Sequence, residues 1–565
     1  MKNSSYLKSS VYLFFLTVFP YFLTKVLTIE KSLTAITLFY ILIIFYTYNK
    51  LGNNLESYLI KKLSIFNKIY LLIYILLFIV FILISQNYFL NIEVITWDVP
   101  SYLVGSQEIK QGNLPFETQW ESKGPLLTYL YFLFSELAGH SYIHFRVLSD
   151  LLLVFAAIVI FKYSLKTTNS KFTSSIAALT FSAIVSMRWY VSEYSEYFSL
   201  IFIAIAFYLF SFTNFINKKY FIVGLLISTA SLINQASIFF LLPYIFYIFF
   251  KEKNIKHFLV LLTGSIIPHL VFFIIYSLNG LVDIYLANYY FIPLGYSTDI
   301  NESSFYELRV WLREFYNYNK LVYFSIIGIF FGYFKNNFSL NLEKFKYDLL
   351  LFHILTSLLI YFIGSHNYAH HLIYFIFFFP LLITKINSFT YQLTIALLIF
   401  IGSSSIFVKS FESSYSNITN MKEVQENYPM NKLANQISGY FTEKNYSVFA
   451  LDYLIILYYL EKPNYSYIVH PTNHFEDYIT DVLEKTNRIK FDNVNYLLSQ
   501  QPQVIICSPE RIHKGKSFKN DEFSCLLEDY KNNYILLDTE IYRIDPRLEF
   551  YWDPYKSINV FIKEK

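Results

Sequence analysis

The residues whose types and spacing could do chemistry lie in one stretch, WDVPSYLVGSQEIKQGNLPFETQWESKGPLLTYL, which covers residues 97–130. Asp98 stands at its start, and Glu117, Glu121 and Lys123 gather toward its end. A carboxylate can take a proton from a hydroxyl group, and a lysine can stabilise a departing phosphate. Acidic residues and a lysine in one loop, held by proline and glycine turns, are typical parts of a binding site for a charged lipid headgroup.

Each of these side chains also has a structural interpretation. An aspartate followed two residues later by a proline is a common helix start, and the local sequence alone favours capping over catalysis for Asp98. Glu117 and Glu121 could pair with Lys123, although exposed ion pairs of this kind stabilise a protein little. The next proline is expected to open a helix, and a lysine gains nothing from the electropositive end of a helix. The position of Lys123 therefore favours a role in binding.

The elements that must position this loop are strongly apolar. The chain has 565 residues, of which 55% are hydrophobic, and a mean hydropathy of +0.39. Apolar stretches of roughly 20 residues recur, and each can cross the hydrocarbon core as a helix. The composition predicts a polytopic α-helical membrane protein. The net charge of +4 is small and the lysines lie in short connections, so no nucleic-acid partner is expected.

The apolar stretches predict about thirteen transmembrane helices. They lie at residues 10–28, 33–48, 69–90, 146–165, 172–187, 194–213, 219–235, 237–250, 256–278, 321–334, 348–364, 371–385 and 389–408. The first stretch contains Pro20 and Lys25 and lacks a small-residue cleavage site, so it is expected to be a span and not a signal peptide.

Lysine and arginine residues predict the orientation of these helices. With the N-terminus inside, five of the predicted inner connections carry lysine at or near their ends, whereas the outer connection 188–193 has one arginine and 365–370 has none. These lysines are Lys50, Lys61, Lys62 and Lys68; Lys162, Lys166 and Lys171; Lys218 and Lys219; Lys251, Lys253 and Lys256; and Lys335, Lys344 and Lys346. This orientation places two long loops, 91–145 and 279–320, on the extracytoplasmic face. It places the polar tail, 409–565, on the same face.

The tail, residues 409–565, differs from the rest of the chain. It has short β-like runs at 446–451, 502–508 and 533–544, with helical patterns at 430–444 and 474–486. Strands that alternate with helices predict a small α/β domain. The only two cysteines, Cys507 and Cys525, fall here; they either form a disulfide in an oxidising compartment or remain thiols.

The loop 91–145 resembles the first extracytoplasmic loop of the GT-C glycosyltransferases. The nearest members are the bacterial enzymes grouped with protein O-mannosyltransferases and the aminoarabinose transferase of lipid A. Their pattern is an acidic pair, a tyrosine, a Gly-x-Pro-Tyr-like stretch, and then acid-x-Lys-Pro-Pro before an apolar helix. The matching residues here are Asp98, Tyr102, Glu117, Glu121 and Lys123.

Two residues of the loop depart from the family pattern. Val99 stands where many members have a second acid, and Gly124 replaces the first proline. The missing acid weakens any site that needs two carboxylates at this point, including a metal site. No metal ligand is assigned from the sequence, although a divalent metal stays open.

Two further stretches resemble later elements of the family. In RWYVSEYSEYFSL, Glu196 matches an acid that precedes a span, with Glu193 as the competitor. In HNYAHHLIYFIFFFPLL, His370 or His371 matches an aromatic–histidine pair that leads into a span. Residues 69–408 would then form the catalytic transmembrane module, and residues 1–68 would add two N-terminal helices to it.

The resemblance implies a polyprenyl-phosphate-sugar-dependent hexosyl- or pentosyltransferase in the cell (inner) membrane. The acceptor is a hydroxyl group of a glycan, lipid or protein on the extracytoplasmic face, the transfer inverts the anomeric carbon, and no cofactor is required. Asp98 is the expected general base, and a position near the bilayer rim is expected to raise its pKa. Tyr102, Glu117, Glu121, Lys123, Glu196 and His370 are expected to bind substrate.

A second set of candidate phosphate ligands lies in the loop 279–320. In YELRVWLREFYNY, residues 306–318, the apolar residues recur at i, i+3, i+4 and i+7, which predicts an amphipathic helix at the interface. Arg309 and Arg313 share its polar face and could grip a phosphate. The structural alternative, which the sequence slightly favours, is that they anchor the helix at lipid headgroups or pair with Glu307 and Glu314.

Other functional classes share a polytopic architecture. A flippase of lipid-linked sugars should carry charged or proline-broken spans near the membrane centre, whereas these spans are nearly uncharged. An O-antigen ligase or polymerase should show an arginine-rich outer loop without the Asp98–Lys123 pattern. A non-catalytic sensor on the same fold would tolerate the loss of Asp98.

Overall fold

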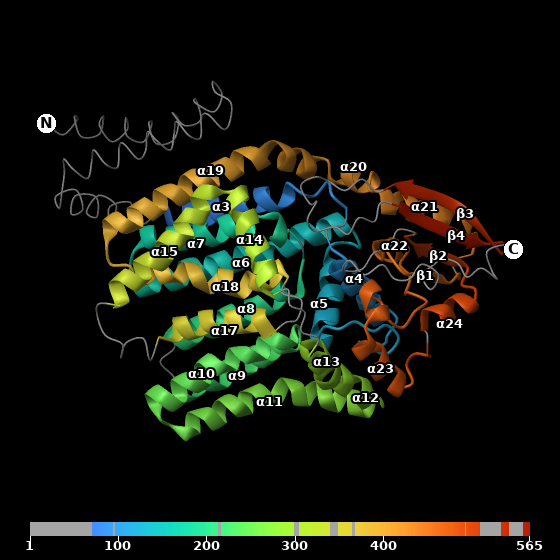
Figure 1. Cartoon of the computed structure of the whole chain (residues 1–565), viewed down its shortest axis with the longest axis horizontal. Coiled ribbons are helices and arrows are strands. Elements are labelled where there is room, and N and C mark those ends of the chain that lie inside the picture. Colours follow the sequence, from blue (N-terminus) through green and yellow to red (C-terminus); the bar gives the residue numbers. More distant parts are fainter. Residues whose placement is uncertain are drawn as a thin grey trace.

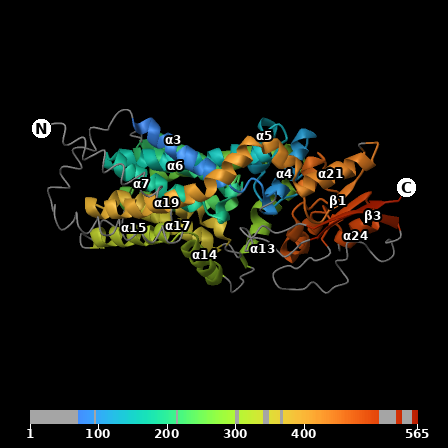
Figure 2. The ribbon, with the colours of Figure 1, turned by 90° about the horizontal axis from the view of Figure 1, so that it is seen from above.

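The computed structural model describes residues 70–93, 96–191, 193–212, 216–298, 304–338, 348–363, 368–443, 445–491, 493–508, 533–541 and 557–564. In these residues, a bundle of apolar helices lies beside a smaller α/β part (Figure 1). Figure 2 shows the α/β part at one end of the bundle, with helices α4 and α5 between the two. The predicted spans at 10–28 and 33–48 lie outside the described residues.

Nine of the predicted spans coincide with single α-helices. These are α3 (Tyr70–Asn87), α6 (Tyr142–Thr168), α7 (Lys171–Val185), α8 (Ser195–Phe212), α9 (Ile216–Ser231), α11 (Ile255–Leu278), α15 (Lys320–Phe338), α17 (Leu349–Ile363) and α19 (Phe389–Thr419). Four of the described helices, α6, α8, α11 and α19, are long and apolar enough to cross a membrane by length and composition. The predicted total of about thirteen spans is therefore not confirmed.

Two predicted spans are irregular helices. The first consists of the 3₁₀ helix η2 (Gln235–Leu241), α10 (Leu242–Phe246) and the π-helix η3 (Tyr247–Glu252). The second consists of η5 (Ala369–Leu372), α18 (Ile373–Phe378) and η6 (Phe379–Lys385). Each contains one proline, Pro243 or Pro380, at a junction between helical segments. Proline cannot donate to the preceding turn, so the α-helical ladder is interrupted there.

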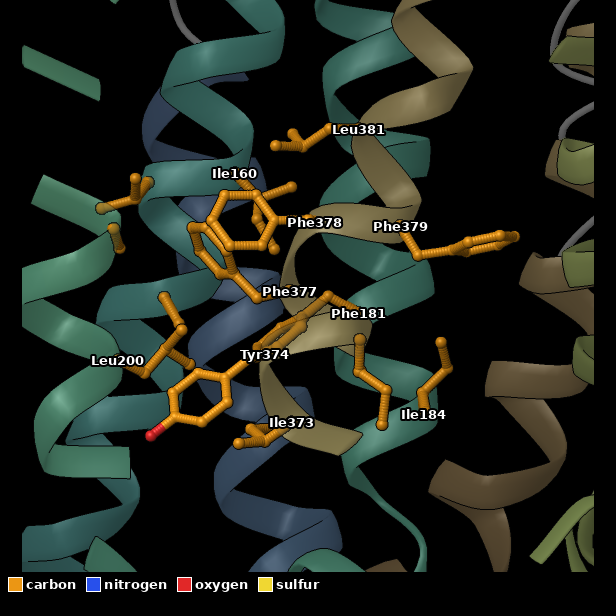
Figure 3. Close-up of a cluster of buried hydrophobic side chains, with 14 of the residues drawn as sticks. Ile160, Phe181, Ile184, Leu200, Ile373, Tyr374, Phe377, Phe378, Phe379 and Leu381 are labelled. Carbon is orange, nitrogen blue, oxygen red and sulfur yellow. The ribbon is translucent and has the colours of Figure 1, made fainter. Parts of the chain in front are cut away.

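The second irregular span lies inside the aromatic core of the bundle. Figure 3 shows Phe377 and Phe378 among side chains that include Ile160 of α6, Phe181 of α7 and Leu200 of α8. The rings of Phe181 and Phe377 meet edge to face, with 6.4 Å between centroids. Aromatic pairs of this geometry contribute beyond the area they bury. The packing fixes the start of the span, where the two neighbouring histidines lie.

The first loop contains two helices, α4 (Asp98–Lys110) and α5 (Pro125–Leu137), joined by a turn-rich segment. The buried carboxylate of Glu108 organises that segment, because it accepts backbone N–H bonds from Phe116 (2.9 Å), Thr118 (3.1 Å) and Gln119 (3.2 Å). Burial raises the pKa of Glu108 to about 8, against the lowering effect of these donors. No role was predicted for Glu108 from the sequence.

The α/β part holds a four-stranded sheet in the order β1-β2-β4-β3. Its strands are β1 (Val448–Ala450), β2 (Val504–Cys507), β3 (Tyr534–Ile541) and β4 (Ser557–Lys563). β1 and β2 pair in parallel, with Val448 opposite Val504, whereas β4 is antiparallel to both β2 and β3. Its helical segments are α20 (Met421–Glu426), α21 (Pro429–Tyr440), α22 (Ile455–Tyr459), η7 (Pro471–Phe475), α23 (Asp477–Lys485) and α24 (Asn493–Ser499).

The structure confirms the α/β character of the tail and corrects two details. The three predicted strand runs contain β1, β2 and β3, but β4 was not predicted. Its signal is the alternation of Ile558, Val560 and Ile562, which are all fully buried. Helix α19 continues to Thr419, so it extends beyond the predicted end of its span at residue 408.

The first loop is joined to the α/β part by backbone pairing. Trp120 donates its N–H to the carbonyl of Tyr467 (2.6 Å), and Val469 donates to the carbonyl of Trp120 (3.1 Å). The Trp120 side chain is fully buried, and the Gln119 amide donates to the carbonyl of Asn464 (3.1 Å). This junction places the segment that follows Val469 beside the start of α4.

Candidate active site

Asp98 is the first residue of α4, but its side chain does not cap the helix. Trp97 occupies the N-cap position and makes no side-chain capping bond. Oδ1 of Asp98 instead lies 3.0 Å from Nε2 of His470, a histidine of the α/β part. The side chains of Asp98 and His470 are 30% and 12% exposed, so both are partly buried. The capping role favoured by the local sequence is therefore not observed.

The charges around Asp98 correct the predicted direction of its pKa. Burial raises the pKa, as expected for a carboxylate at a low-dielectric boundary. The hydrogen bond and charge of His470, together with the charges of His370 and Lys123, have a larger combined effect and hold the pKa well below its usual range. Asp98 is therefore ionised at neutral pH, which is the form a base requires.

Lys123 pairs with Glu196 and not with the acids of its own loop. Its Nζ lies 3.7 Å from Oε1 of Glu196, at the start of α8, and the side chains are 23% and 3% exposed. Glu196 also accepts hydrogen bonds from the Asn234 amide (2.8 Å) and the Ser195 hydroxyl (3.1 Å). The competitor Glu193 pairs instead with a different partner, Arg146, at 3.5 Å. Of the two acids, Glu196 is the one that lies in the cluster with Lys123.

The backbone on either side of Lys123 is held by neighbouring elements. Gly124 donates its N–H to the carbonyl of Ile233 (3.1 Å), and the Asn288 amide donates to the carbonyl of Lys123 (2.9 Å). A Cβ at Gly124 would collide with the carbonyl of Leu232. A proline has neither the N–H nor the space here, which explains the departure from the family pattern.

Two histidines complete the cluster. The buried ring of His370 stacks on Tyr194 at 3.9 Å with an interplanar angle of 7°, and its Nδ1 has no hydrogen-bond partner among the described residues. Nε2 of His371 lies 3.8 Å from Oε1 of Glu196. One ligand atom from each of Glu196, His370 and His371 lies within 4.8 Å of the others, and these donor types suit a divalent metal. A metal there would compete with Lys123 for the Glu196 carboxylate.

Tyr102 and Glu121 lie close to the cluster. Tyr102 is buried, and its ring meets that of Tyr131 edge to face at 5.3 Å. Burial raises its pKa, and the charges of Asp98 and Glu121 raise it further. Oε1 of Glu121 accepts bonds from Ser122, whereas its buried Oε2 has no hydrogen-bond partner in the described part of the chain. That oxygen can accept a hydrogen bond from a hydroxyl group of a bound molecule.

The other predicted ligands lie elsewhere. Glu117 is exposed and accepts the N–H of Leu114 (2.9 Å), which closes a turn. Arg309 and Arg313 are exposed on α14 (Ser304–Tyr318), and Nε of Arg313 lies 3.6 Å from Oε1 of Glu314. Among the described residues, no hydrogen bond or ion pair joins any of the three to the Asp98–Lys123 cluster. The structural alternative for Arg313, pairing with Glu314, is observed.

Two residues of the site, His470 and Asn234, were not predicted from the sequence. His470 stands 372 positions from Asp98 in a segment without a recognisable motif, so no local signal pointed to it. Asn234 had a signal, because a polar pair, Asn234 and Gln235, ends an otherwise apolar span.

Comparison with known proteins shows the fold. No protein-family model matches the sequence, and neither does any curated protein. The crystal structure of ArnT from Cupriavidus metallidurans bound to undecaprenyl phosphate matches with a TM-score of 0.58 at 11% identity, and the match covers 87% of this chain and 98% of that chain. Its apo structure matches with a TM-score of 0.55 at 10% identity, over 86% and 97% of the two chains. The chain therefore has the GT-C fold that the first loop predicted.

Proposed function

We propose that this protein is a membrane glycosyltransferase that moves a sugar from a polyprenyl phosphate to an acceptor hydroxyl. The observation that carries the proposal is the cluster of an ionised Asp98, held by His470, with the partly buried Lys123–Glu196 pair in a chain of GT-C fold. The similar ArnT structure holds undecaprenyl phosphate, which supports a donor of that class.

The proposed reaction is a displacement at the anomeric carbon with inversion. The acceptor oxygen forms a bond to that carbon and loses its proton to Asp98. The bond from the sugar to the phosphate oxygen breaks, and its electron pair leaves with the polyprenyl phosphate. Lys123 stabilises the charge that develops on the phosphate. Its backbone is held in place by the bond from Asn288 to its carbonyl and by the bond of the next residue, Gly124, to Ile233.

The proposed reaction takes place on the extracytoplasmic face. Cys507 in β2 is disulfide-bonded, and Cys525, outside the described residues, is the only other cysteine of the chain. Disulfides persist in oxidising compartments, so this bond supports an extracytoplasmic α/β part. The lysine distribution of the sequence supports the same orientation. Since His470 of this part contacts Asp98, the site would lie on that face as well.

The function can be tested in cells by deleting the gene and profiling envelope glycans by mass spectrometry. We expect one sugar to disappear from one class of acceptor and its polyprenyl-phosphate form to accumulate on the extracytoplasmic leaflet. Unchanged glycans without accumulation of a lipid-linked sugar would contradict the proposal. Accumulation on the cytoplasmic leaflet would contradict it in favour of a flippase.

Lys123→Ala is expected to weaken donor binding. The substitution removes the ammonium group that would contact the phosphate, and a charged hydrogen bond contributes about 1.5–3 kcal/mol, so the Kd for undecaprenyl phosphate should rise about tenfold or more. Titration of the purified protein in detergent with undecaprenyl phosphate measures this change. Lys110→Ala is the matched control, because Lys110 is exposed and pairs with Glu461 at 2.7 Å. Equal affinities of the two variants would remove Lys123 from the donor site.

A further inference from the structure

His470 reaches Asp98 from a different part of the chain and in a defined hydrogen-bonding state. Its Nδ1 lies 3.3 Å from the backbone N and 2.9 Å from Oγ1 of Thr472. A backbone N–H can only donate, so in the neutral ring Nδ1 is the acceptor and the hydrogen is on Nε2; a protonated ring also donates from Nε2. That hydrogen points to Oδ1 of Asp98, 3.0 Å away. The histidine therefore donates to the carboxylate and does not compete with it for a proton.

The position of His470 is fixed by the junction between the first loop and the α/β part. Ile468 forms a parallel β-bridge with Trp120, and Val469 donates its N–H to the Trp120 carbonyl. Pro471 opens η7 directly after the histidine. The imidazole thus stands between a backbone bridge and a helical turn, and it is only 12% exposed. Fixed supports of this kind are typical of groups that orient a catalytic side chain.

We propose that His470 is a positioning residue that holds Oδ1 of Asp98, so that Oδ2 faces the acceptor hydroxyl. No hydrogen bond joins Oδ2 to the described residues, whereas Oδ1 has its partner in His470. The membrane module thus supplies the base, and the α/β part supplies the group that orients it. The consequence for turnover rests on the proposed function, but the link between the two side chains can be tested without turnover.

The charged groups around Asp98 predict the direction in which its pKa changes when His470 is removed. The titratable groups that interact electrostatically with Asp98 include His470 from the α/β part, Lys123 and Tyr102 from the first loop, and His370 and His371 from the start of the second irregular span. Of these, His470, His370 and Lys123 lower its pKa. A carboxyl group with a lowered pKa stays ionised as the pH falls, until its own folded-state value is reached. Loss of His470 removes the hydrogen-bond partner, so protonation of Asp98 should begin at a higher pH.

Labelling with dicyclohexylcarbodiimide, which reacts with protonated carboxyl groups, tests the link on the full-length protein. We expect the labelled fraction of Asp98 in His470→Ala, mapped by mass spectrometry across the acidic range, to exceed that of the wild type about tenfold, because one pKa unit changes the protonated fraction tenfold. The variant should also reach a plateau at the acid end. If the substitution only gave the reagent better access to Asp98, labelling would rise by the same factor at every pH, and no plateau would appear.

Two further variants keep the test decisive. His470→Gln retains the bulk and a donor and should give a smaller increase, and Thr472→Val removes only the Oγ1 contact with Nδ1 and should give a small increase in the same direction. His144→Gln, at an exposed histidine, is the matched control and should label like the wild type. Wild-type labelling curves for folded His470→Gln and Thr472→Val would overturn the proposal, even if His470→Ala fails to fold.

Turnover then separates this inference from the proposed function. In a protein that transfers sugar, His470→Gln should lower kcat about 10²-fold through misplacement of the base, with the KM for donor changed less than about twofold. The acid limb of its pH–rate profile should also move upward. An unchanged kcat would overturn the orienting role. If the wild type transfers no polyprenyl-phosphate sugar, the proposed function fails, while the labelling curves still decide the link between His470 and Asp98.

Discussion

Asp98→Asn is expected to abolish sugar transfer while the protein remains folded in the membrane. An amide has the same shape as the carboxylate, and its oxygen can still accept the hydrogen on Nε2 of His470. It cannot take a proton from the acceptor, and loss of a general base costs about 10²–10⁴-fold in rate. The loss of the negative charge should also leave Lys123 and His370 without one of their neighbouring anions. We therefore expect the turnover rate to fall by about 10⁴-fold, the upper end of that range.

The measurement is sugar transfer by the purified variant in liposomes, with size-exclusion chromatography to establish that it is folded. Glu117→Gln is the matched control, because it neutralises a carboxylate of the same loop that is exposed and closes a turn. We expect the control to keep most of its activity. Full turnover by folded Asp98→Asn would show that another group takes the proton.

Gly124→Ala is expected to destabilise the protein and to displace Lys123. The added Cβ would collide with the backbone carbonyl of Leu232 and lie 2.9 Å from Oη of Tyr289. A backbone carbonyl at the end of a packed helix cannot move independently, and overpacking of this kind costs about 1–3 kcal/mol. Movement would also strain the bond from the Gly124 N–H to Ile233. The collision with Leu232 and the strained bond to Ile233 would both move residue 124, and with it the adjacent Lys123.

Thermal unfolding in detergent and undecaprenyl phosphate affinity measure the two effects of Gly124→Ala. The control is Gly105→Ala in α4, where an added Cβ meets nothing within 4 Å. Alanine is favoured over glycine inside a helix by about 1 kcal/mol, so the control should unfold at the same or a higher temperature. If both alanine variants unfold at the same temperature and bind undecaprenyl phosphate equally, the close approach of Gly124 to the Leu232 carbonyl does not restrict the residue at this position.

Local patterns were sufficient to predict most of the helices and the α/β tail. Long apolar runs have one outcome in a bilayer, so nine predicted spans appear as single helices. The irregular spans were harder, since a proline in an apolar run does not reveal where 3₁₀ or π turns form. Strand β4 was missed although its buried residues Ile558, Val560 and Ile562 recur at every second position, because this short strand lies at the far end of a polar tail.

The candidate site was only partly predictable because its contacts are long-range. Asp98, Lys123, Glu196 and His370 were named from motifs, and the fold brings them together. The predicted rise in the pKa of Asp98 was wrong, because burial was foreseen but His470 was not. Nearness of residues 372 positions apart depends on tertiary packing, which no local pattern encodes.

The backbone bridge between Trp120 and the 467–469 segment has a pharmacological consequence. It joins the first loop to the α/β part and so holds Asp98 and His470 together. Figure 1 shows the α/β part beside the apolar bundle. In the proposed orientation, a water-soluble compound or antibody that separated these two segments would remove His470 from Asp98 without crossing the lipid. Screening for such molecules would start from this junction.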